Sequence, residues 1–505
     1  MPTFSSTNFL AIAPLLTVII TGMVVLMVDL ALPRDRKSLL VFLSTIGLLI
    51  AAFFCGPVLW TRGLTGFSGT VVADDFALLF QFILIVVAVL SVFLSERYIQ
   101  IKGINHGEYY ALLLFSTSGA MLMAASRELI TIFVGLEILS IALYILSGFA
   151  RTEAKSEESA MKYFLLGSFS SAFFLYGIAL VYGGTGTTRL DVLAHMPVAL
   201  LATKYTVAGI ALLIVGLGFK AAIVPFHSWT PDVYEGAPTS VTAFMSAGAK
   251  AGAFAAFIRV TIALLPLSVV FHSVLWILAI LTMIVGNILA VVQTNIKRML
   301  AYSSIAHAGY ILVGLLSQNN DGHAGVLFYV MAYTFMNLGA FGVLILLARR
   351  GDELNTIEDL QGLASRQPGA AALMALFMLS LGGIPPTAGF MGKFYLFLAA
   401  VHAHQYALAV IGLVASVIGV FYYLRVIASM YFLPARRDFP TGHPFRFAPG
   451  ADIAVIMCAV MTLWLGIYSG GLINIARIGA DSLDKGAVAV PIASAPAPVV
   501  RASAR

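Results

Sequence analysis

Five ionisable residues lie deep inside long apolar runs of the sequence: Glu137, Lys220, Lys250, His307 and Lys393. A charge in the middle of a membrane-length apolar run is costly and is functional by default. All three residue types can gain and lose a proton, because burial disfavours their charged forms and a nearby opposite charge favours them. We therefore expect the five side chains to form a proton relay. The competing interpretation is a static ion pair between Glu137 and Lys220 that fixes helix packing.

Lys220 lies in a run, residues 208–238, that reads AGIALLIVGLGFKAAIVPFHSWTPDVYEGAP. Pro225 follows the lysine by five residues and breaks a helix there. At about 1.5 Å per residue, an ammonium at this position is too deep to reach either membrane surface easily. The expected partner is Glu137, since contact between the two side chains would change the proton affinity of both.

The other candidates have polar or small neighbours at helical spacing. Glu137 heads a stripe of Ser140, Tyr144 and Ser147, and His307 shares a helix face with Ser303, Ser304 and Tyr310. Lys250 lies between Gly248 and Gly252, which allow close helix approach or leave room for water. The alternatives are interhelical bonding by the serines, a packing role for the histidine, and anchoring of Lys393 near its helix end.

Weaker candidates lie close to the ends of apolar runs. Asp74 and Arg259 are two of them, and we expect their side chains to reach from the span ends to the membrane interface. Asp232 follows Thr230 and Pro231, a pattern typical of a helix start, so helix capping suffices to explain it.

The composition is that of an all-α polytopic membrane protein. The chain has 505 residues, of which 60% are hydrophobic and 10% charged, with a mean hydropathy of +0.97. A soluble domain has about 25% charged residues. The two cysteines, Cys55 and Cys458, can form neither a disulfide framework nor an iron–sulfur cluster. Any redox chemistry must therefore belong to partner subunits.

Apolar runs of about 20 residues predict fourteen transmembrane helices. The expected spans are 9–30, 38–60, 72–95, 109–125, 129–149, 159–183, 205–226, 238–263, 270–293, 299–317, 323–348, 370–401, 406–433 and 450–471. They divide into three N-terminal helices (1–108), a first five-helix repeat (109–263), a second (270–433) and a last helix (450–471). Residues 472–505 are rich in alanine and proline, and we expect a disordered tail.

The two five-helix units are predicted to be inverted repeats. Residues 127–144 match residues 297–314, pairing Glu137 with His307, and a second match pairs Tyr163 with Tyr329. Corresponding helices lie five spans apart, so the units have opposite orientations, and such repeats carry broken helices at the site. We expect breaks in helices 7 and 12. Aligning Leu217-Gly218 with Leu381-Gly382 places Ile384, not Lys393, opposite Lys220.

Basic residues predict the orientation. With the N-terminus outside, the inner loops hold fifteen lysines and arginines and the outer loops only four. Because inner loops carry the excess of positive charge, both termini are expected on the outer side.

The chain resembles the antiporter-like membrane subunits of respiratory complex I, the NADH:quinone oxidoreductase. The resemblance rests on KYFLLGSFSSAFFLYGIALVYG, GFKAAIVPFHSWTPDVYEGAPTSVTAFMSAGAKAGAF, NIKRMLAYSSIAHAGYILVG and LSLGGIPPTAGFMGKFYLF. It implies proton translocation in a bacterial inner membrane, driven by NADH oxidation elsewhere. It also implies that NADH, FMN, iron–sulfur clusters and quinone are bound by partner subunits, including antiporter-like paralogues, and not by this chain.

The resemblance assigns roles to the same five residues. Glu137 and Lys220 look like the pair of the first unit, Lys250 the connecting lysine, His307 a link in the central polar axis and Lys393 the lysine of the second unit. One paralogue has glutamate in place of Lys393 and another continues into a long lateral helix, and this chain has neither feature. The alternative function is a subunit of a multi-subunit cation/proton antiporter, which shares the lysine–glutamate scheme.

Overall fold

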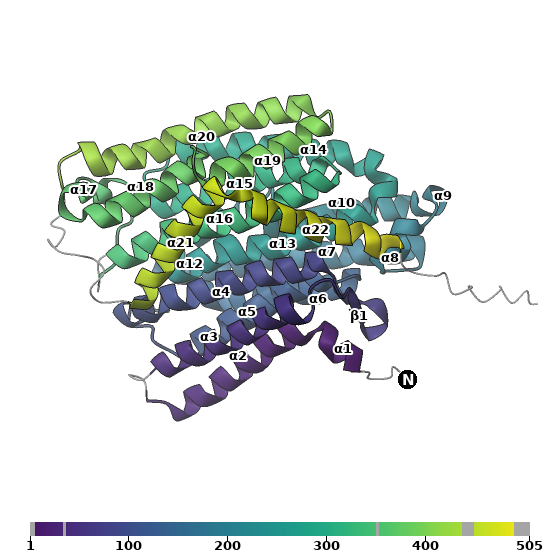
Figure 1. The fold of residues 1–505 in the computed structure, drawn as a ribbon, viewed down its shortest axis with the longest axis horizontal. Helices are drawn as coiled ribbons and strands as arrows, with labels where there is room; N and C mark the ends of the chain where they lie inside the picture. The colour runs from purple at the N-terminus through teal and green to yellow at the C-terminus, as the bar shows by residue number, and fades with distance from the viewer. Residues whose placement is uncertain (1–5, 34–36, 350–352, 437–448, 489–505) are drawn as a thin grey trace, which may run out of the picture.

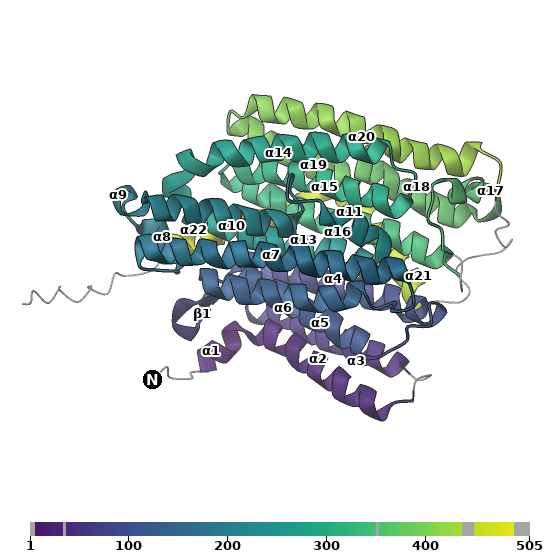
Figure 2. The same cartoon turned by 180° about the vertical axis from the view of Figure 1, so that it is seen from behind.

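The computed structural model describes residues 6–33, 37–349, 353–436 and 449–488, and these form a bundle of long helices that run roughly side by side (Figures 1 and 2). The all-α expectation has one exception in the described part, an antiparallel hairpin of β1 (Leu64–Gly66) and β2 (Val71–Ala73). Each strand has three residues, too few for an alternating pattern to stand out in the sequence.

The N-terminal part contains four helices, with a π-helical turn at Phe54–Val58. They are α1 (Ser6–Ala11), α2 (Ala13–Ala31), α3 (Ser38–Phe53) and α4 (Asp75–Ile101). The predicted start of the third span at residue 72 falls in β2 instead. Helix α4 begins at Asp75 because the Asp74 side chain caps it, accepting a hydrogen bond from the Ala77 amide at 2.8 Å.

The two predicted repeats contain the next sixteen helices. In residues 109–263 these are α5 (Glu108–Ala125), α6 (Leu129–Ser147), α7 (Ala154–Thr185), α8 (Leu190–His195), α9 (Val198–Leu201), α10 (Lys204–Ala221), α11 (Trp229–Gly236), α12 (Thr239–Phe244) and α13 (Lys250–Ala263). In residues 270–433 they are α14 (Ser268–Val291), α15 (Ile296–Leu316), α16 (Asn320–Leu347), α17 (Leu363–Arg366), α18 (Pro368–Gly382), α19 (Ala388–His402) and α20 (Tyr406–Phe432). Helices α21 (Pro449–Ile467) and α22 (Ser469–Val488) follow.

Twelve spans in the described residues are long and apolar enough to cross a membrane. The two predicted spans outside this set are 109–125, which forms α5, and 370–401, which is divided between the shorter apolar helices α18 and α19. The total of fourteen stays a prediction.

Both predicted breaks interrupt helices. Helix α10 ends at Ala221, followed by Ala222 at φ 60°, and α18 ends at Gly382, followed by Gly383 at φ 83°. These two left-handed residues are 161 positions apart, so superposing the helix ends would pair Lys220 with Leu381, whereas the alignment predicted from sequence pairs it with Ile384.

The most deeply buried helices lie at the centre of the bundle. Almost every residue of α12, α13, α15 and α16 is buried. In α2, α3, α14 and α20 less than half of the apolar stretch is buried. In a membrane the helices that face lipid must be apolar outward, whereas the buried helices can carry polar side chains that find partners inside the bundle. Helix α16 packs against α4, α15, α18, α19, α21 and α22, so residues on α13, α15 and α16 are remote from the lipid-facing surface.

The expected disordered tail is wrong for residues 472–488, which form most of α22; residues 489–505 lie outside the described part. Ile473, Ala476, Ala480 and Leu483 recur at helical spacing and are buried. This face packs on α4 and α16 (Figure 1), and Arg477 pairs with Asp321. The small alanines that suggested disorder instead let the helix approach its neighbours closely.

The close crossing of α5 and α6 gives a packing prediction. A Cβ added at Gly119 would collide with the backbone of Leu139 and Gly135 on α6. We expect Gly119→Val to destabilise the fold by about 1–3 kcal/mol, the usual cost of overpacking. The measurement is the apparent melting temperature of the purified protein. Gly471→Ala is the control, since nothing lies within 4 Å of its added Cβ; equal melting temperatures for the two variants would contradict the crossing.

Candidate functional site

Lys220 is 4% exposed in the last turn of α10. Its ammonium donates hydrogen bonds to Ser140 Oγ of α6 at 2.8 Å and to the Tyr163 hydroxyl of α7 at 3.1 Å. The Tyr163 ring stacks on Trp229 of α11, with centroids 4.4 Å apart. Trp229 in turn donates from Nε1 to the Phe219 carbonyl at 3.0 Å. The helix after the break thus holds the end of α10 and the partner of its lysine.

Glu137 lies one helical turn from Ser140 on α6, and accepts a hydrogen bond from the Ser171 hydroxyl of α7. No ion pair within 4.0 Å joins it to Lys220 in the described structure. The two charges still interact electrostatically. The expected direct contact between the two side chains is not formed: Lys220 bonds Ser140, three residues after Glu137 on the same helix, and Glu137 bonds Ser171.

Lys250 begins α13, directly after a π-helical turn at Met245–Ala249 that the sequence did not predict. Its ammonium is 4% exposed and donates to both the carbonyl and the hydroxyl of Ser304 on α15, the latter at 2.6 Å. It lies 5.2 Å from the centroid of the Tyr333 ring. Single π-turns inside helices occur frequently at functional sites because they redirect side chains.

His307 is 1% exposed at the centre of α15. Its Nδ1 bonds the Tyr329 hydroxyl of α16 and its Nε2 lies 3.1 Å from the Tyr423 hydroxyl of α20. The rings of Tyr310 and Tyr333 complete the surroundings, with centroids 5.7 and 5.1 Å from the imidazole. Both ring nitrogens therefore contact groups that can donate or accept a proton.

Lys393 is 6% exposed on α19, and its ammonium reaches back to the end of α18. It donates to the carbonyls of Leu381 at 3.1 Å and Gly382 at 3.0 Å, and to Ser416 Oγ at 2.8 Å. Carbonyls at a helix C-terminus lack partners within the helix and favour a cation. Lys393 is thus buried at the second break, and the anchoring interpretation of this residue does not fit.

The five residues are brought into one series across the bundle interior. A hydrogen bond of 3.5 Å links Tyr234 to Ser304, the partner of Lys250. The Trp229 ring separates Tyr234 from Tyr163, with centroids 6.3 and 4.4 Å away. At the far end the ring of Tyr310 lies between His307 and Lys393, 5.0 Å from the ammonium. Side chains in the described part therefore form hydrogen-bonded segments separated by aromatic rings.

The residues that sequence reasoning missed are mainly tyrosines. The sequence match paired Tyr163 with Tyr329, and in the structure one bonds Lys220 and the other bonds His307. A tyrosine in an apolar run needs a partner for its hydroxyl when buried, and this requirement was the available signal. The sequence matches pair neither Tyr333 nor Tyr423 with another tyrosine, so only the structure places them.

Two of the weaker candidates form a buried ion pair. Arg259 of α13 contacts Asp74 at 2.6 Å, with side chains 5% and 6% exposed, so neither reaches toward the interface as expected. Asp232 does not act as a helix cap; it forms ion pairs with Lys162 at 2.7 Å and Arg298 at 2.6 Å. These ion pairs fix helix ends, because each of the cations Arg259, Lys162 and Arg298 has a carboxylate partner.

A polar cavity of about 440 Å³ lies where α4 and α11 end and α15 begins, lined by Lys102, Glu153, Lys297 and Glu353 among others. Glu353 accepts from the Tyr98 hydroxyl at 2.6 Å and lies 3.2 Å from the Lys102 ammonium. Burial alone would raise the pKa of Glu353, but the charges of Lys297 and Lys102 and the Tyr98 hydroxyl hold the pKa below its ordinary value.

In the described part of the chain no three histidine, cysteine, aspartate or glutamate side chains gather at a site that could hold a metal ion. The two cysteines are buried and unpaired. His402 pairs with Asp321 at 3.1 Å, both of them substantially exposed.

The family of the chain follows from its similarity to known proteins. A family model described as NADH:quinone oxidoreductase/Mrp antiporter, TM matches residues 126–419. NADH-quinone oxidoreductase subunit N of Trichlorobacter lovleyi is 46% identical over 477 residues, which cover 94% of this chain and 97% of the relative. The chain belongs to the NADH-quinone oxidoreductase subunit N family.

Chains of solved membrane complexes share this fold. A chain of respiratory complex I from Thermus thermophilus with bound aureothin matches with 33% identity and a TM-score of 0.77, over 91% of this chain and 98% of that one. A chain of the Mrp complex from Dietzia sp. matches with a TM-score of 0.82 over 95% of this chain and 97% of that one, at 22% identity. The latter likeness shows a shared fold alone.

The contacts of Glu353 in the 440 Å³ cavity give a pH prediction. Because the pKa of Glu353 is lowered in the folded protein, its ionised form stabilises the fold above the ordinary value of 4.5, and this stabilisation is lost as the pH falls through the folded-state pKa. We expect Glu353→Gln to lower the apparent melting temperature at pH 7 by about 2 °C and to reduce its fall on acidification.

The measurement is a melting curve at several pH values between 7 and 3. Glu358→Gln is the matched control, because Glu358 pairs with Arg436 where both side chains are more than half exposed and solvent screens the pair. A steeper acid decline in Glu353→Gln than in the unmodified protein would contradict the assignment.

Proposed function

We propose that this chain is a membrane subunit of NADH:quinone oxidoreductase that conducts protons through Glu137, Lys220, Lys250, His307 and Lys393. The observation that carries the proposal is the series of three lysines, 4–6% exposed, which are bonded by hydroxyls and carbonyls and not by carboxylates. A buried ammonium without a counter-ion is poorly stabilised, so it can lose its proton. The neutral amine still has hydroxyl partners.

Lys220 and Glu137 supply the switch in this proposal. Ser140, the acceptor for Lys220, is three residues from Glu137 on the same helix. A side-chain movement of Lys220 from Ser140 toward Glu137 would form an ion pair and favour the charged lysine. The return movement would favour release of the proton toward Tyr163.

We further propose fourteen spans and two inverted repeats. The matching left-handed ends of α10 and α18 support this arrangement. In addition, Lys393 bonds the carbonyl of Leu381, which corresponds to Lys220 by these helix ends. Two lysines from different chain positions therefore meet equivalent breaks, which explains their failure to align in sequence.

The redox energy would come from partner subunits that bind NADH, FMN, iron–sulfur clusters and quinone, as in the complex to which subunit N relatives belong by name. We propose that the subunit lies in a bacterial inner membrane with both termini on the periplasmic side; the excess of basic residues in the inner loops supports this orientation. Its partners would include the antiporter-like paralogues.

The alternative function, a subunit of a cation/proton antiporter complex, shares the fold. Relatives named subunit N are 46% and 42% identical over most of the chain, whereas the Mrp structure is 22% identical. Sequence similarity thus favours the respiratory complex. Co-purification with an NADH-oxidising flavin and iron–sulfur assembly is the observation that separates the two functions.

Substitution of Lys220 tests the relay. We expect Lys220→Met to lower NADH-driven proton uptake by vesicles carrying the complex about tenfold or more, since a positioned proton-transfer group contributes about 10²-fold or more. Lys220→Arg should also lower proton uptake, because arginine keeps the charge but does not release its proton. Glu137→Gln should depress uptake in the same way.

Lys204→Met is the matched control, at the exposed first turn of the same helix α10. Co-purification with the NADH-oxidising subunits shows that each variant has assembled. Normal proton uptake by assembled Lys220→Arg would exclude proton transfer by this lysine and leave it a structural role.

A further inference from the structure

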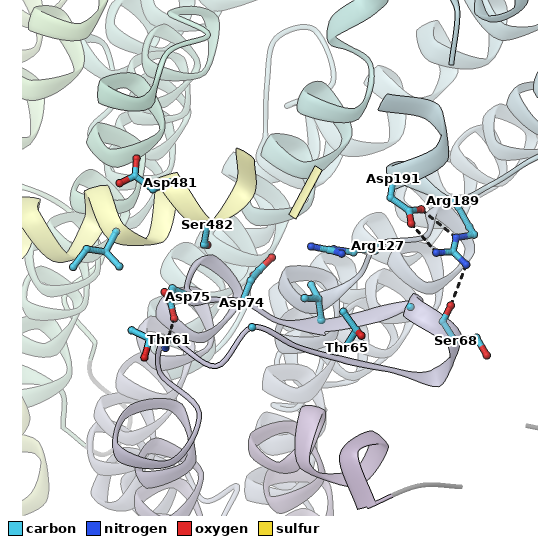
Figure 3. A pocket seen from close by; sticks show the side chains of 14 residues that line it. Thr61, Thr65, Ser68, Asp74, Asp75, Arg127, Arg189, Asp191, Asp481 and Ser482 are labelled. Atoms are coloured by element: carbon cyan, nitrogen blue, oxygen red, sulfur yellow. Dashed lines mark hydrogen bonds and ion pairs between the residues drawn. The ribbon is translucent and has the colours of Figure 1, made fainter. Parts of the chain in front are cut away.

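A polar cavity of about 760 Å³ opens between α22, the β1–β2 hairpin and the segment joining α7 to α8 (Figure 3). Arg127 and Asp74 face this space, and Asp481 and Ser482 of α22 lie along its edge. The proposed proton relay uses none of these residues. The volume of the cavity is in the range of small-ligand sites, about 300–1,000 Å³.

Arg127 is a cation of this cavity that interacts electrostatically with Asp74 and Asp191 but forms no ion pair with either. Its backbone is fixed, since its amide donates to the Thr70 carbonyl at 2.8 Å and its carbonyl accepts from the Leu190 amide at 2.9 Å. Its guanidinium makes no hydrogen bond or ion pair with any residue that the structure describes. Burial, together with the neighbouring Arg259 charge, lowers the pKa of Arg127. A guanidinium in such a position fits a phosphate group, which it can bind through two N–H donors.

The remaining charges of the cavity are mostly paired. Arg189 and Asp191 bind each other, with contacts of 2.6 and 3.1 Å, and Asp74 is neutralised by Arg259. Asp481 accepts a hydrogen bond from Asn320 but has no cation within 4.0 Å among the described residues. The cavity therefore offers one unpaired cation and at least one unpaired carboxylate. This combination fits a zwitterion better than a simple anion.

A second, apolar cavity of about 590 Å³ lies beside the polar one. It is lined by the next residues of the same segments: Trp60 before Thr61, Leu79 after Asp75, and Leu472 and Ile475 before Ile478. Phe82 and Ile475 are 39% and 42% exposed there. Between Asp75 and Phe82, α4 advances about 10 Å into the apolar layer. The two cavities thus place a polar chamber at the membrane surface and an apolar groove below it.

We propose that these cavities bind one phospholipid with a zwitterionic aminoalkyl-phosphate headgroup. The phosphate lies at Arg127, the ammonium faces the carboxylates of the chamber, and one acyl chain fills the groove between α4 and α22. The charges of the polar chamber and the apolar groove beside it together match the headgroup and acyl chain of a phospholipid. The lipid would also hold α22 in place, since that helix contributes to both cavities.

The test is native mass spectrometry of the membrane assembly that contains this chain, purified and exchanged into phosphatidylethanolamine or phosphatidylglycerol. We expect one retained phosphatidylethanolamine whose apparent affinity falls about tenfold or more in Arg127→Ala, as for loss of a charge-assisted hydrogen bond. Phosphatidylglycerol, which lacks the ammonium, should be retained more weakly. Inorganic phosphate should not compete, because it has no acyl chain.

Two further variants separate binding from folding. Ile475→Trp fills the groove without altering the chamber, and should also reduce retention. Arg62→Ala removes an exposed guanidinium of the neighbouring loop that lines neither cavity and should leave retention unchanged. Retention unaffected by both Arg127→Ala and Ile475→Trp would overturn the proposal, as would equal retention of the two lipids or loss of lipid in Arg62→Ala.

Discussion

The central constraint on this fold is the cost of placing lysine ammonium groups inside an apolar bundle. Lys220, Lys250 and Lys393 are bonded by hydroxyls and carbonyls from neighbouring helices, and none has a carboxylate within ion-pairing distance among the described residues. These partners are neutral. They satisfy the donors of the ammonium without supplying a fixed counter-charge.

The helix breaks follow from the same constraint. A continuous helix has no free carbonyls in its middle, because each one accepts an intrahelical hydrogen bond. Ending α18 at Gly382 frees carbonyls at depth, and Lys393 takes two of them. At the other break the freed Phe219 carbonyl binds Trp229, which stacks on the Tyr163 that holds Lys220. Both breaks thus position a lysine, one directly and the other through two aromatic residues.

The sequence was sufficient for the elements that depend on composition and spacing. Apolar runs located most of the helices, proline and glycine located both breaks, and isolated charges in apolar runs located the five candidate residues. It failed where tertiary contacts decide. The π-turn before Lys250, the stacking of Trp229 and the tyrosine cluster around His307 depend on helices far apart in the chain. The tail was misjudged because alanine-rich composition indicates disorder only when no neighbouring surface can bury it.

The two kinds of buried cation in this chain show how residue type decides between structure and proton transfer. Arg259 is buried about as deeply as the lysines, yet it pairs directly with Asp74 at 2.6 Å. Arginine stays protonated, so a carboxylate partner gives a permanent pair that fixes α13 against α4. Lysine can be deprotonated when desolvated, and here its partners are hydroxyls and carbonyls. At Lys220 the acceptor is the Ser140 hydroxyl and not a carboxylate, so no fixed ion pair holds this lysine in the described structure.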